Sequence, residues 1–384
     1  MSSSVDLTDL DAWQERVPYE EFARLRRDAP IVWFDEELPN HGFWSIHRYA
    51  DIVEISRDTK RFSSADGISF EEPTEEDMAA RRTIIDMDPP EHTKLRRVLA
   101  PSFTPRAVAV YEHFVRSLTT VVLDDAIPQG EFDFVRYVAR DANTDPEITD
   151  VVWGRDDTDE YRLFPFRSPY GKQLWDIGRE LVRERLLDPS DDLLSVVLSA
   201  EIDGERLSEV DLDNFFSILV IAGNETTRIA IAQGILYFCE NPGEWDRLRS
   251  DPSLLNSATE EVLRYSCPTH FMRRTANEDI TFKGVEMKKG DKVILWYVSG
   301  NRDEDVFTEP ERFDVGRSPN PHLSFGRGGP HMCLGAHLAR LEVRVVLEEL
   351  SKRVKRFELA GEPARIRANF TNGLKRLPIT VTPV

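Results

Sequence analysis

A single cysteine near the C-terminal end of the chain has the surroundings that a reactive or metal-binding sulfur needs. Cys333 lies in a glycine-rich stretch that leads into residues 334–350, whose apolar residues recur at helical spacing. The sequence therefore predicts that Cys333 sits at a helix N-terminus, where unpaired N–H groups and the helix dipole favour thiolate over thiol. The backbone can turn sharply there and a large flat ligand can approach closely, because no Cβ is present at Gly326, Gly328, Gly329 and Gly335.

Two other interpretations of Cys333 are open on the residues alone. A lone cysteine is commonly a small buried hydrophobe without chemistry. A zinc ion could instead be bound by His331, Cys333 and His337, although no fourth ligand lies nearby in the sequence. The glycines and the helix start favour a bound ligand over both.

The longest predicted helix runs from Ser208 to Glu240 and contains a polar cluster at its centre. Gly223 costs about 1 kcal/mol relative to alanine inside a helix, so its presence needs a physical reason. Glu225 and Thr226 follow it within an otherwise apolar segment. Such side chains can divert backbone hydrogen bonds and open the helix for a small molecule or water. Core packing, with a threonine bonded back to its own helix, is the alternative.

A pair of basic side chains lies on a shorter helix, which Pro89 and Pro90 open. His92 and Arg96 are four residues apart, so they share one face of this helix. Two adjacent donors of this kind suit a pair of carboxylates. A solvated helix face is the other interpretation.

The elements that must position these residues are mostly helices, with a few short strands. Periodicity predicts helices over residues 18–29 and 49–56, and strands over 31–34, 42–47, 280–287 and 291–297. An Asn-Gly hairpin signal stands at Asn372 and Gly373. With 384 residues, of which 40% are hydrophobic, the chain can bury a large core.

The charge and the cysteines exclude several classes of protein. A net charge of -20 opposes general binding to nucleic acid or to an anionic membrane. The three cysteines are odd in number and far apart, unlike a secreted disulfide framework. The N-terminal residues have neither a basic flank nor an apolar run, so we expect no signal peptide or membrane anchor and a soluble cytoplasmic protein.

The stretch from Phe325 to Gly335 resembles the cysteine loop of the cytochrome P450 heme-thiolate enzymes, Phe-x-x-Gly-x-x-x-Cys-x-Gly. One additional residue separates Phe325 from Cys333, so Gly329 takes the register of the second glycine. The longer Gly-Gly-Pro-His loop is similar to that of bacterial members that act on sterol side chains and branched lipids. Three further segments match the family in the same order along the chain: His92-x-x-x-Arg96, Ala222-Gly-x-Glu225-Thr226 and Glu261-x-x-Arg264.

The resemblance implies one domain over residues 1–384, mainly α-helical with small β-sheets (α+β). In this P450 fold, heme b would lie between the long central helix and the helix that follows the cysteine loop. One segment departs from the family: after Asp141 another core helix is expected, but residues 142–146 follow at once and nothing supplies it. Deleting a core helix would expose the apolar faces packed against it, so we favour a numbering that closes over a missing stretch.

The resemblance also implies roles for individual residues. Cys333 would be the iron ligand, and Glu225 and Thr226 would be the catalytic residues that deliver protons beside bound oxygen. The heme would be bound by His92, Arg96, Ala222, Gly223, Arg274, Phe325, Gly326, His331, Cys333 and Gly335. The substrate pocket would be lined by Ile68, Phe70, Val220, Ile221, Phe271, Met272 and Thr371. A structural network would join Glu261, Arg264 and Arg312.

On this basis we expect a monooxygenase that inserts one atom of O2 into a C–H bond of a steroid, terpenoid, branched lipid or fatty acid. Electrons would come from NAD(P)H through a ferredoxin reductase and a ferredoxin, which would dock on a basic patch of Lys94, Arg97, Arg106 and Arg327. We expect a monomer that binds no nucleic acid. The alternatives are a non-catalytic heme- or ligand-binding protein and a peroxide-driven relative; the presence of Glu225 and Thr226 argues against both.

Overall fold

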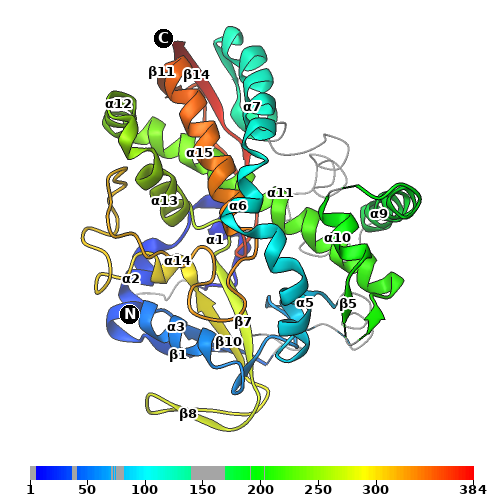
Figure 1. The fold of residues 1–384 in the computed structure, drawn as a ribbon. Coiled ribbons are helices and arrows are strands. Elements are labelled where there is room, and N and C mark those ends of the chain that lie inside the picture. Colours follow the sequence, from blue (N-terminus) through cyan, green and yellow to red (C-terminus); the bar gives the residue numbers. More distant parts are fainter. Residues whose placement is uncertain are drawn as a thin grey trace.

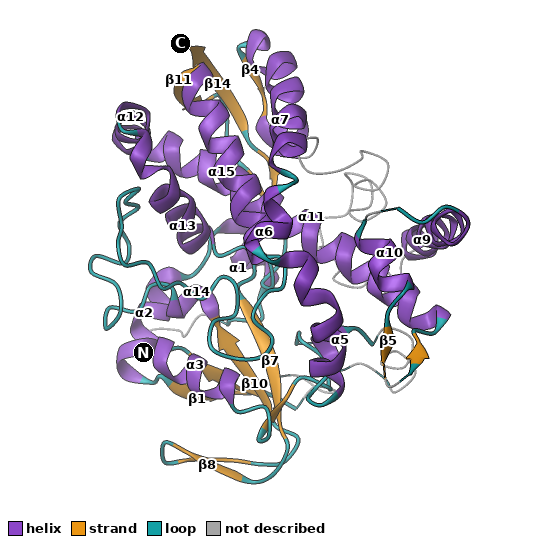
Figure 2. Ribbon diagram, in the orientation of Figure 1, coloured by secondary structure: helices purple, strands orange, loops and turns teal. Residues whose placement is uncertain are grey.

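The computed structural model describes residues 6–36, 41–70, 72, 74, 82–139, 169–190, 192–202 and 204–384. Helices make up most of this part of the chain, and the sheets are small (Figure 1 and Figure 2). The architecture is therefore the mainly helical one with small sheets that the sequence predicts.

The largest sheet has five strands and combines strands from the N-terminal part of the chain with strands from residues 271–296. Its strand order is β1 (Ile31–Phe34), β2 (Phe43–Ile46), β10 (Lys292–Trp296), β7 (Phe271–Ala276) and β3 (Phe62–Ser63). β10 pairs parallel with β2 and antiparallel with β7. The strands predicted over 31–34, 42–47 and 291–297 are confirmed. A buried apolar cluster joins this sheet to α2 (Tyr19–Asp28) and α3 (Tyr49–Arg57), the two helices predicted near the N-terminus.

A group of long helices forms the other part of the fold, and α11 (Glu209–Glu240) runs through its centre (Figure 1). α11 packs on α13 (Leu255–Ser266) and α15 (Ala336–Arg353), and α15 packs on α7 (Glu112–Ala126). Ser208, the first residue of the predicted helix, is the N-cap of α11 and forms a capping box with Asp211. By length and composition α11 could cross a membrane, but 61% of its most apolar stretch is buried inside the protein, as in a core helix.

Shorter elements complete the described fold. The other helices are α1 (Leu10–Glu15), α5 (Glu91–Leu99), α6 (Pro105–Ala109), α9 (Pro169–Leu187), α10 (Leu193–Leu198), α12 (Pro242–Ser250), α14 (Tyr297–Gly300) and the π-helical turn η4 (Val135–Ala139). The 3-10 turns are η1 (Ile84–Asp86), η2 (Ala100–Phe103), η3 (Ile127–Gln129) and η6 (Pro252–Leu254). The other strands are β4 (Glu131–Asp133), β5 (Glu201–Ile202), β6 (Glu205–Arg206), β8 (Ile280–Phe282), β9 (Val285–Met287), β11 (Val354–Leu359), β12 (Ala364–Arg365), β13 (Leu374–Arg376) and β14 (Pro378–Pro383).

The position at which the sequence lacks an expected core helix lies outside the described residues. The described chain stops after η4, which packs against α7 and α11, and resumes with α9. The expectation of a missing stretch near residues 141–146 therefore stays a prediction.

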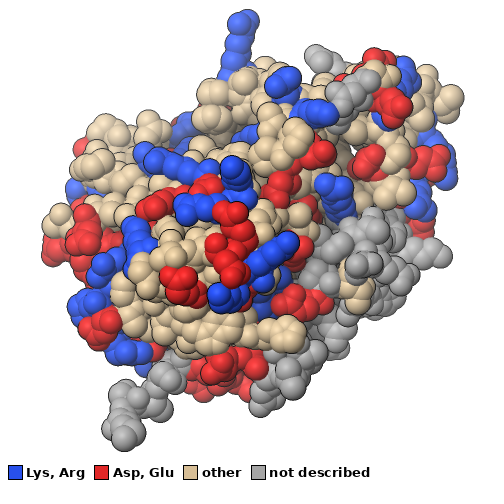
Figure 3. Space-filling view, turned by 90° about the horizontal axis from the view of Figure 1, so that it is seen from below, with Lys and Arg blue, Asp and Glu red and all other residues tan. Residues whose placement is uncertain are grey.

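Basic and acidic side chains are intermixed on the face of the molecule seen from below (Figure 3). Neither sign forms an extended area among the described residues of that face.

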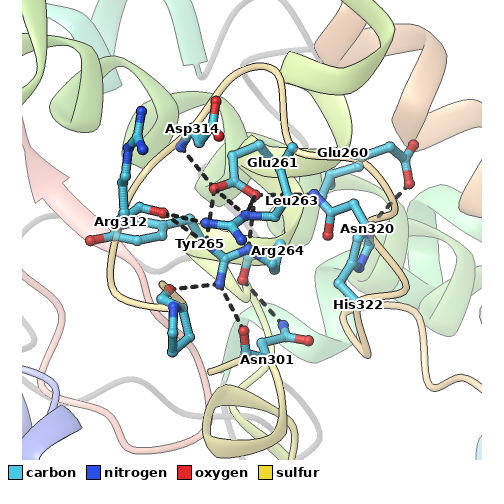
Figure 4. Close-up of polar contacts among 12 residues, drawn as sticks. Glu260, Glu261, Leu263, Arg264, Tyr265, Asn301, Arg312, Asp314, Asn320 and His322 are labelled. Carbon is cyan, nitrogen blue, oxygen red and sulfur yellow. Dashed lines mark hydrogen bonds and ion pairs between the residues drawn. The ribbon is translucent and has the colours of Figure 1, made fainter. Parts of the chain in front are cut away.

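One buried carboxylate holds part of the irregular chain between α14 and α15. Glu261 of α13 accepts hydrogen bonds from Arg264 Nε and Nη2, both at 2.8 Å (Figure 4). It also accepts a hydrogen bond from Arg317 Nε at 3.1 Å. Its oxygens also accept the Asp314 N–H at 2.9 Å and the Asn320 side-chain amide at 3.0 Å. Burial acts to raise the pKa of Glu261, but the neighbouring Arg264 and Arg317 guanidiniums hold that pKa below its ordinary value.

The prediction that the Arg312 side chain is the third member of this network is wrong. Its side chain is 52% exposed and pairs with Glu309, and only its backbone carbonyl accepts a hydrogen bond from Arg264 (Figure 4). Arg317, whose side chain is 8% exposed, takes the predicted position instead. The sequence match located the segment, but in an irregular chain no periodicity tells which arginine turns inward.

Removing Arg317 should destabilise the fold far more than removing Arg312. Arg317→Ala leaves Glu261 buried with one cation fewer, and we expect a loss of about 3 kcal/mol in the free energy of unfolding, as for other broken buried pairs. Arg312→Ala, the matched control, removes only an exposed pair worth under about 1 kcal/mol. Urea unfolding of both variants measures the difference. Equal losses would show that Arg317 does not support the network.

Candidate functional site

Cys333 lies just before α15, at the end of a tightly turned loop. Its backbone N–H donates to the Phe325 carbonyl at 2.8 Å, which closes the loop. α15 begins at Ala336, two residues after the predicted start, and Gly335 is its N-cap residue. The predicted position of Cys333 at a helix N-terminus is thus confirmed within one turn.

The glycines of this loop serve different purposes. Gly326 and Gly328 have φ angles of 68° and 107°, a region that favours glycine. Gly329 lies directly against α3, where an added Cβ would be 2.0 Å from the Ser56 carbonyl oxygen. A Cβ on Gly335 would meet nothing within 4 Å. The expectation that the glycines make room for a flat ligand is therefore wrong for Gly328 and Gly329, which allow the turn and the contact with α3.

The Cys333 side chain lies deep in the protein and is nevertheless accessible. Burial raises the pKa of its thiol, while the Gly335 N–H and the Arg96 and Arg340 guanidiniums act in the opposite direction. Burial prevails, so the helix N-terminus alone does not produce the thiolate that the sequence suggests. A metal ion bound to the sulfur would produce the thiolate, because a coordinating thiol is deprotonated.

The zinc interpretation finds no support in the described part of the chain. No three His, Cys, Asp or Glu side chains come together there in a way that could hold a metal ion. His337 is exposed on α15. Cys267 is buried and Cys239 is half-buried, as expected of small hydrophobic side chains.

α11 presents an accessible face at its centre. Ala222 and Gly223 are exposed, although the helix runs through the middle of the fold, and a Cβ on Gly223 would meet nothing within 4 Å. Thr226 lies one turn further on the same face and is partly exposed, whereas Glu225 is buried. The Thr226 hydroxyl donates to the Ala222 carbonyl at 2.9 Å. α11 is a continuous helix here, so the expected opening is absent and the alternative, a threonine bonded back to its own helix, is observed.

Four predicted ligand-binding residues from three elements form one cluster. The rings of His92 and His331 are in contact, tilted by 45° with centroids 4.3 Å apart, next to Arg96 and Arg274. Burial, followed by the neighbouring arginine charges, lowers the pKa of both imidazoles, that of His331 to about 2. The positive charge of the cluster at neutral pH therefore comes from the arginines, and the neutral histidines contribute hydrogen bonds. His92 Nδ1 and His331 Nε2 are buried and have no hydrogen-bond partner among the described residues.

These residues fit a heme. Buried imidazole nitrogens beside two guanidiniums are the donors that two buried carboxylates require. The accessible sulfur of Cys333 can bind iron, and the surface of α11 at Ala222 and Gly223 has no side chain that would prevent close approach. α11 and α15 pack together, so both features belong to one region of the fold.

Part of the predicted substrate pocket belongs to the packed core instead. Phe271 is fully buried, and its ring centroid lies 4.6 Å from that of Phe70 and 4.9 Å from that of Trp296. The prediction that Phe271 lines the pocket is therefore wrong, because its side chain offers no surface to a ligand. Ile68, Phe70 and Met272 pack in or against the same cluster.

The other predicted pocket residues lie on α11 and near the C-terminal hairpin. Val220 and Ile221 are half-buried on α11, just before the accessible face. Thr371 is 4% exposed, and its hydroxyl has no hydrogen-bond partner among the described residues. These three stay candidates for contact with a substrate.

Sequence reasoning missed Glu342. This carboxyl on α15 forms a hydrogen bond with Thr227 on α11, the residue that follows Thr226. Burial raises the pKa of Glu342 to about 8, and the bond with Thr227 opposes the shift only in part. The sequence pattern that could have identified Glu342 is its position on an apolar helix face, because Leu338, Val345 and Val346 lie one turn before or after it.

Comparisons with known proteins agree with this arrangement. The family model described as "Cytochrome P450" matches residues 176–364. The chain is 38% identical to a methyl-branched lipid omega-hydroxylase of Mycobacterium tuberculosis over 405 residues, covering 98% of this chain and 95% of the relative. It is 38% identical to a linalool 8-monooxygenase of Pseudomonas putida, covering 98% and 99%. A Mycobacterium marinum cytochrome P450 in complex with pseudoionone has the same fold, with a TM-score of 0.89, 32% identity and 98% of both chains covered.

This chain has fewer residues than its alignment with the lipid omega-hydroxylase has positions. The share of this chain in the 405-residue alignment, 98% of 384 residues, is about 376 residues. About 29 aligned positions therefore have no residue in this chain. That is enough for a helix with its connecting loop.

Glu342 should make the stability of the protein depend on pH. Because its pKa in the folded protein lies above the ordinary value of 4.5, the folded state holds a proton that the unfolded chain releases between about pH 4.5 and 8. The free energy of unfolding should fall as the pH rises through this window. Glu342→Gln removes the fall, so the variant gains stability relative to the wild type from pH 5 to pH 8 in urea unfolding.

Glu348→Gln on the same helix is the control. Arg116 and Lys352 hold the pKa of Glu348 below its ordinary value despite partial burial, so its contribution is constant over this window. A parallel shift of both variants at every pH would show that Glu342 does not titrate as stated.

Proposed function

The chain belongs to the cytochrome P450 family and is a monooxygenase of hydrophobic small molecules, and we propose that it hydroxylates a terpenoid, steroid, branched lipid or fatty acid. The observation that carries the proposal is the accessible sulfur of Cys333 deep inside the fold. Support for the substrate class comes from relatives named for methyl-branched lipids and linalool. The half-buried apolar side chains of Val220 and Ile221 agree with it.

The residues around the site would hold the heme in one orientation. Heme, when bound, supplies oxygen binding and the oxidising power for C–H insertion. Cys333 would be its iron ligand, with a backbone N–H already bonded to Phe325. Arg96 and Arg274 would balance the charge of the two carboxylates, and His92 and His331 would donate hydrogen bonds to them. Ala222, Gly223, Gly326 and Gly335 would permit close approach.

Proton delivery would come from α11. Thr226 is partly exposed on the accessible face, and its hydroxyl could exchange its hydrogen bond to the Ala222 carbonyl for one to a molecule bound at that face. Glu225 is buried beside it and is the nearest acid in sequence that can pass a proton to that hydroxyl. The substrate reaction therefore uses a proton held at Thr226 Oγ1.

Electrons would come from NAD(P)H through a ferredoxin reductase and a ferredoxin. Arg97, Arg106 and Arg327 are exposed, and Lys94 is partly exposed. The helix that carries Arg97 touches the cysteine loop, because Arg96 Nη2 donates to the Met332 carbonyl at 2.6 Å. A donor bound at this basic patch would be close to the loop of Cys333. We place the reaction in the cytoplasm, in line with the bacterial relatives.

Replacing the sulfur tests the proposal directly. Cys333→Ser should abolish the absorption band of the reduced, carbon monoxide-bound protein that is diagnostic of a thiolate opposite the gas. Cys239→Ser, a half-buried cysteine elsewhere, should leave the band unchanged. The assignment of Cys333 fails if the wild type lacks this band or if the Cys333 variant keeps it.

Thr226→Ala should separate electron use from product formation. The variant keeps heme and substrate binding but loses the hydroxyl, so reducing equivalents go to hydrogen peroxide and product per NADH falls about tenfold or more. Thr227→Val, at the neighbouring buried position, should keep the wild-type ratio. The NADH consumed and the peroxide and product formed are measured in parallel for both variants. An unchanged ratio of product to NADH in Thr226→Ala would contradict the proposed role of this hydroxyl.

A further inference from the structure

An ion pair between α13 and α15 packs against the cysteine loop and has no part in the heme contacts described above. Arg340 of α15 donates to Glu260 of α13 through Nε at 2.6 Å and through Nη2 at 3.0 Å. Two parallel hydrogen bonds fix the plane of the guanidinium as well as its distance. The Arg340 and Glu260 side chains are 30% and 28% exposed, so the pair lies at the border between interior and solvent.

Glu260 also binds the segment that leads into the cysteine loop. His322 Nε2 lies 3.1 Å from Glu260 Oε2, and His322 Nδ1 accepts the Ser324 N–H at 3.3 Å (Figure 4). An imidazole that accepts at Nδ1 carries its proton on Nε2, so His322 donates to Glu260. The His322 and Phe325 ring centroids are 5.6 Å apart. Glu260 therefore fixes Arg340 and the start of the loop at the same time.

Arg340 reaches the Cys333 sulfur by contact and by charge. Its guanidinium carbon lies 4.5 Å from the centre of the Phe325 ring, and the Phe325 carbonyl accepts the Cys333 N–H at 2.8 Å. Burial raises the pKa of the Cys333 thiol, and the charges of Arg96 and Arg340 oppose that rise. Arg96 is assigned to the heme carboxylates, so Arg340 is the basic group near the sulfur that has no other assigned role.

The two charges of the pair act on the sulfur in opposite directions. A guanidinium near a thiolate stabilises the negative charge on sulfur, and the sulfur then shares less of it with iron. A weaker sulfur donor favours ferrous over ferric iron, because the added electron meets less negative charge. The carboxylate in contact with the guanidinium offsets part of this effect. Arg340 alone would therefore raise the reduction potential of the iron, and Glu260 limits the rise.

We propose that the Glu260–Arg340 pair sets how strongly Cys333 donates to iron, and hence how readily the iron accepts its first electron. Arg340 is a positioning residue that acts through Phe325 and through its charge, and Glu260 holds it in place and offsets that charge. The proposal rests on the proposed function, in which Cys333 is the iron ligand. Groups behind a metal ligand commonly tune the metal in this way.

The midpoint potential of the heme-loaded protein, titrated with an electrode and redox mediators, tests the proposal. Arg340→Gln replaces the charge by a neutral amide and should lower the equilibrium constant for one-electron reduction about tenfold, or about 59 mV. Glu260→Gln leaves the guanidinium without its counter-charge and should raise that constant by a similar factor. The double variant should return close to the wild-type potential, because both charges are absent.

Two further variants separate charge from structure. Arg340→Lys keeps the positive charge but not the two parallel hydrogen bonds, and should restore most of the potential that Arg340→Gln loses. Arg344→Gln is the matched control. Arg344 lies one turn further along α15, its side chain is 26% exposed, and it pairs with Glu112 at 2.8 Å. Its removal should leave the potential unchanged.

Two results would overturn the proposal. If Arg340→Gln and Glu260→Gln move the potential in the same direction, or neither moves it, the pair only supports the loop. If Arg340→Gln loses heme, Glu260→Gln decides alone, and an unchanged or lowered potential in that variant excludes the role. Each sample is first reduced under carbon monoxide. A wild type without the thiolate band contradicts the iron ligand itself, whereas a wild type with the band and variants without the opposite shifts contradicts only the role of the pair.

Discussion

The long irregular chain between α14 and α15 depends on two adjacent carboxylates of α13. From Asn301 to Gly335 it contains no helix or strand, yet it must present Cys333 at one fixed place. Glu261 binds its middle part through Arg317, and Glu260 accepts hydrogen bonds from Arg340 of α15 at 2.6 Å and lies 3.1 Å from His322 Nε2. Neighbouring residues of one helix thereby hold both sides of the loop.

This constraint reaches the sulfur through few contacts. The Arg340 guanidinium that binds Glu260 lies 4.5 Å from the centre of the Phe325 ring, and the Phe325 carbonyl accepts the Cys333 N–H. Burying so many charges is costly unless each is paired, so the network either forms completely or destabilises the loop. A rigid loop in turn fixes the orientation of a ligand atom, which metal sites require of the groups behind their ligands.

The sequence predicted the helix after Cys333, the bounds of α11 and the three main strands, because each carries a clear periodicity or capping signal. It also grouped His92 and Arg96 on one helix face, where the structure has them. It failed where side-chain direction is not periodic: Arg317 rather than Arg312 turns inward, and Phe271 points into the aromatic core rather than to a pocket. Gly328 and Gly329 were expected to make room for a ligand, but their neighbour is α3, about 270 residues earlier in the chain, and no local sequence pattern reveals that contact.

The packing that positions the site leaves part of α7 out. Val115 of α7 packs with Leu341 and Val345 of α15, whereas Phe114 and Val121 are 66% and 67% exposed and take no part in that contact. The elements that position Cys333 and Thr226 are α11, α13 and α15, which pack on one another. A change at the exposed residues of α7 would therefore leave the contact between α7 and α15, and with it the geometry of the site, intact.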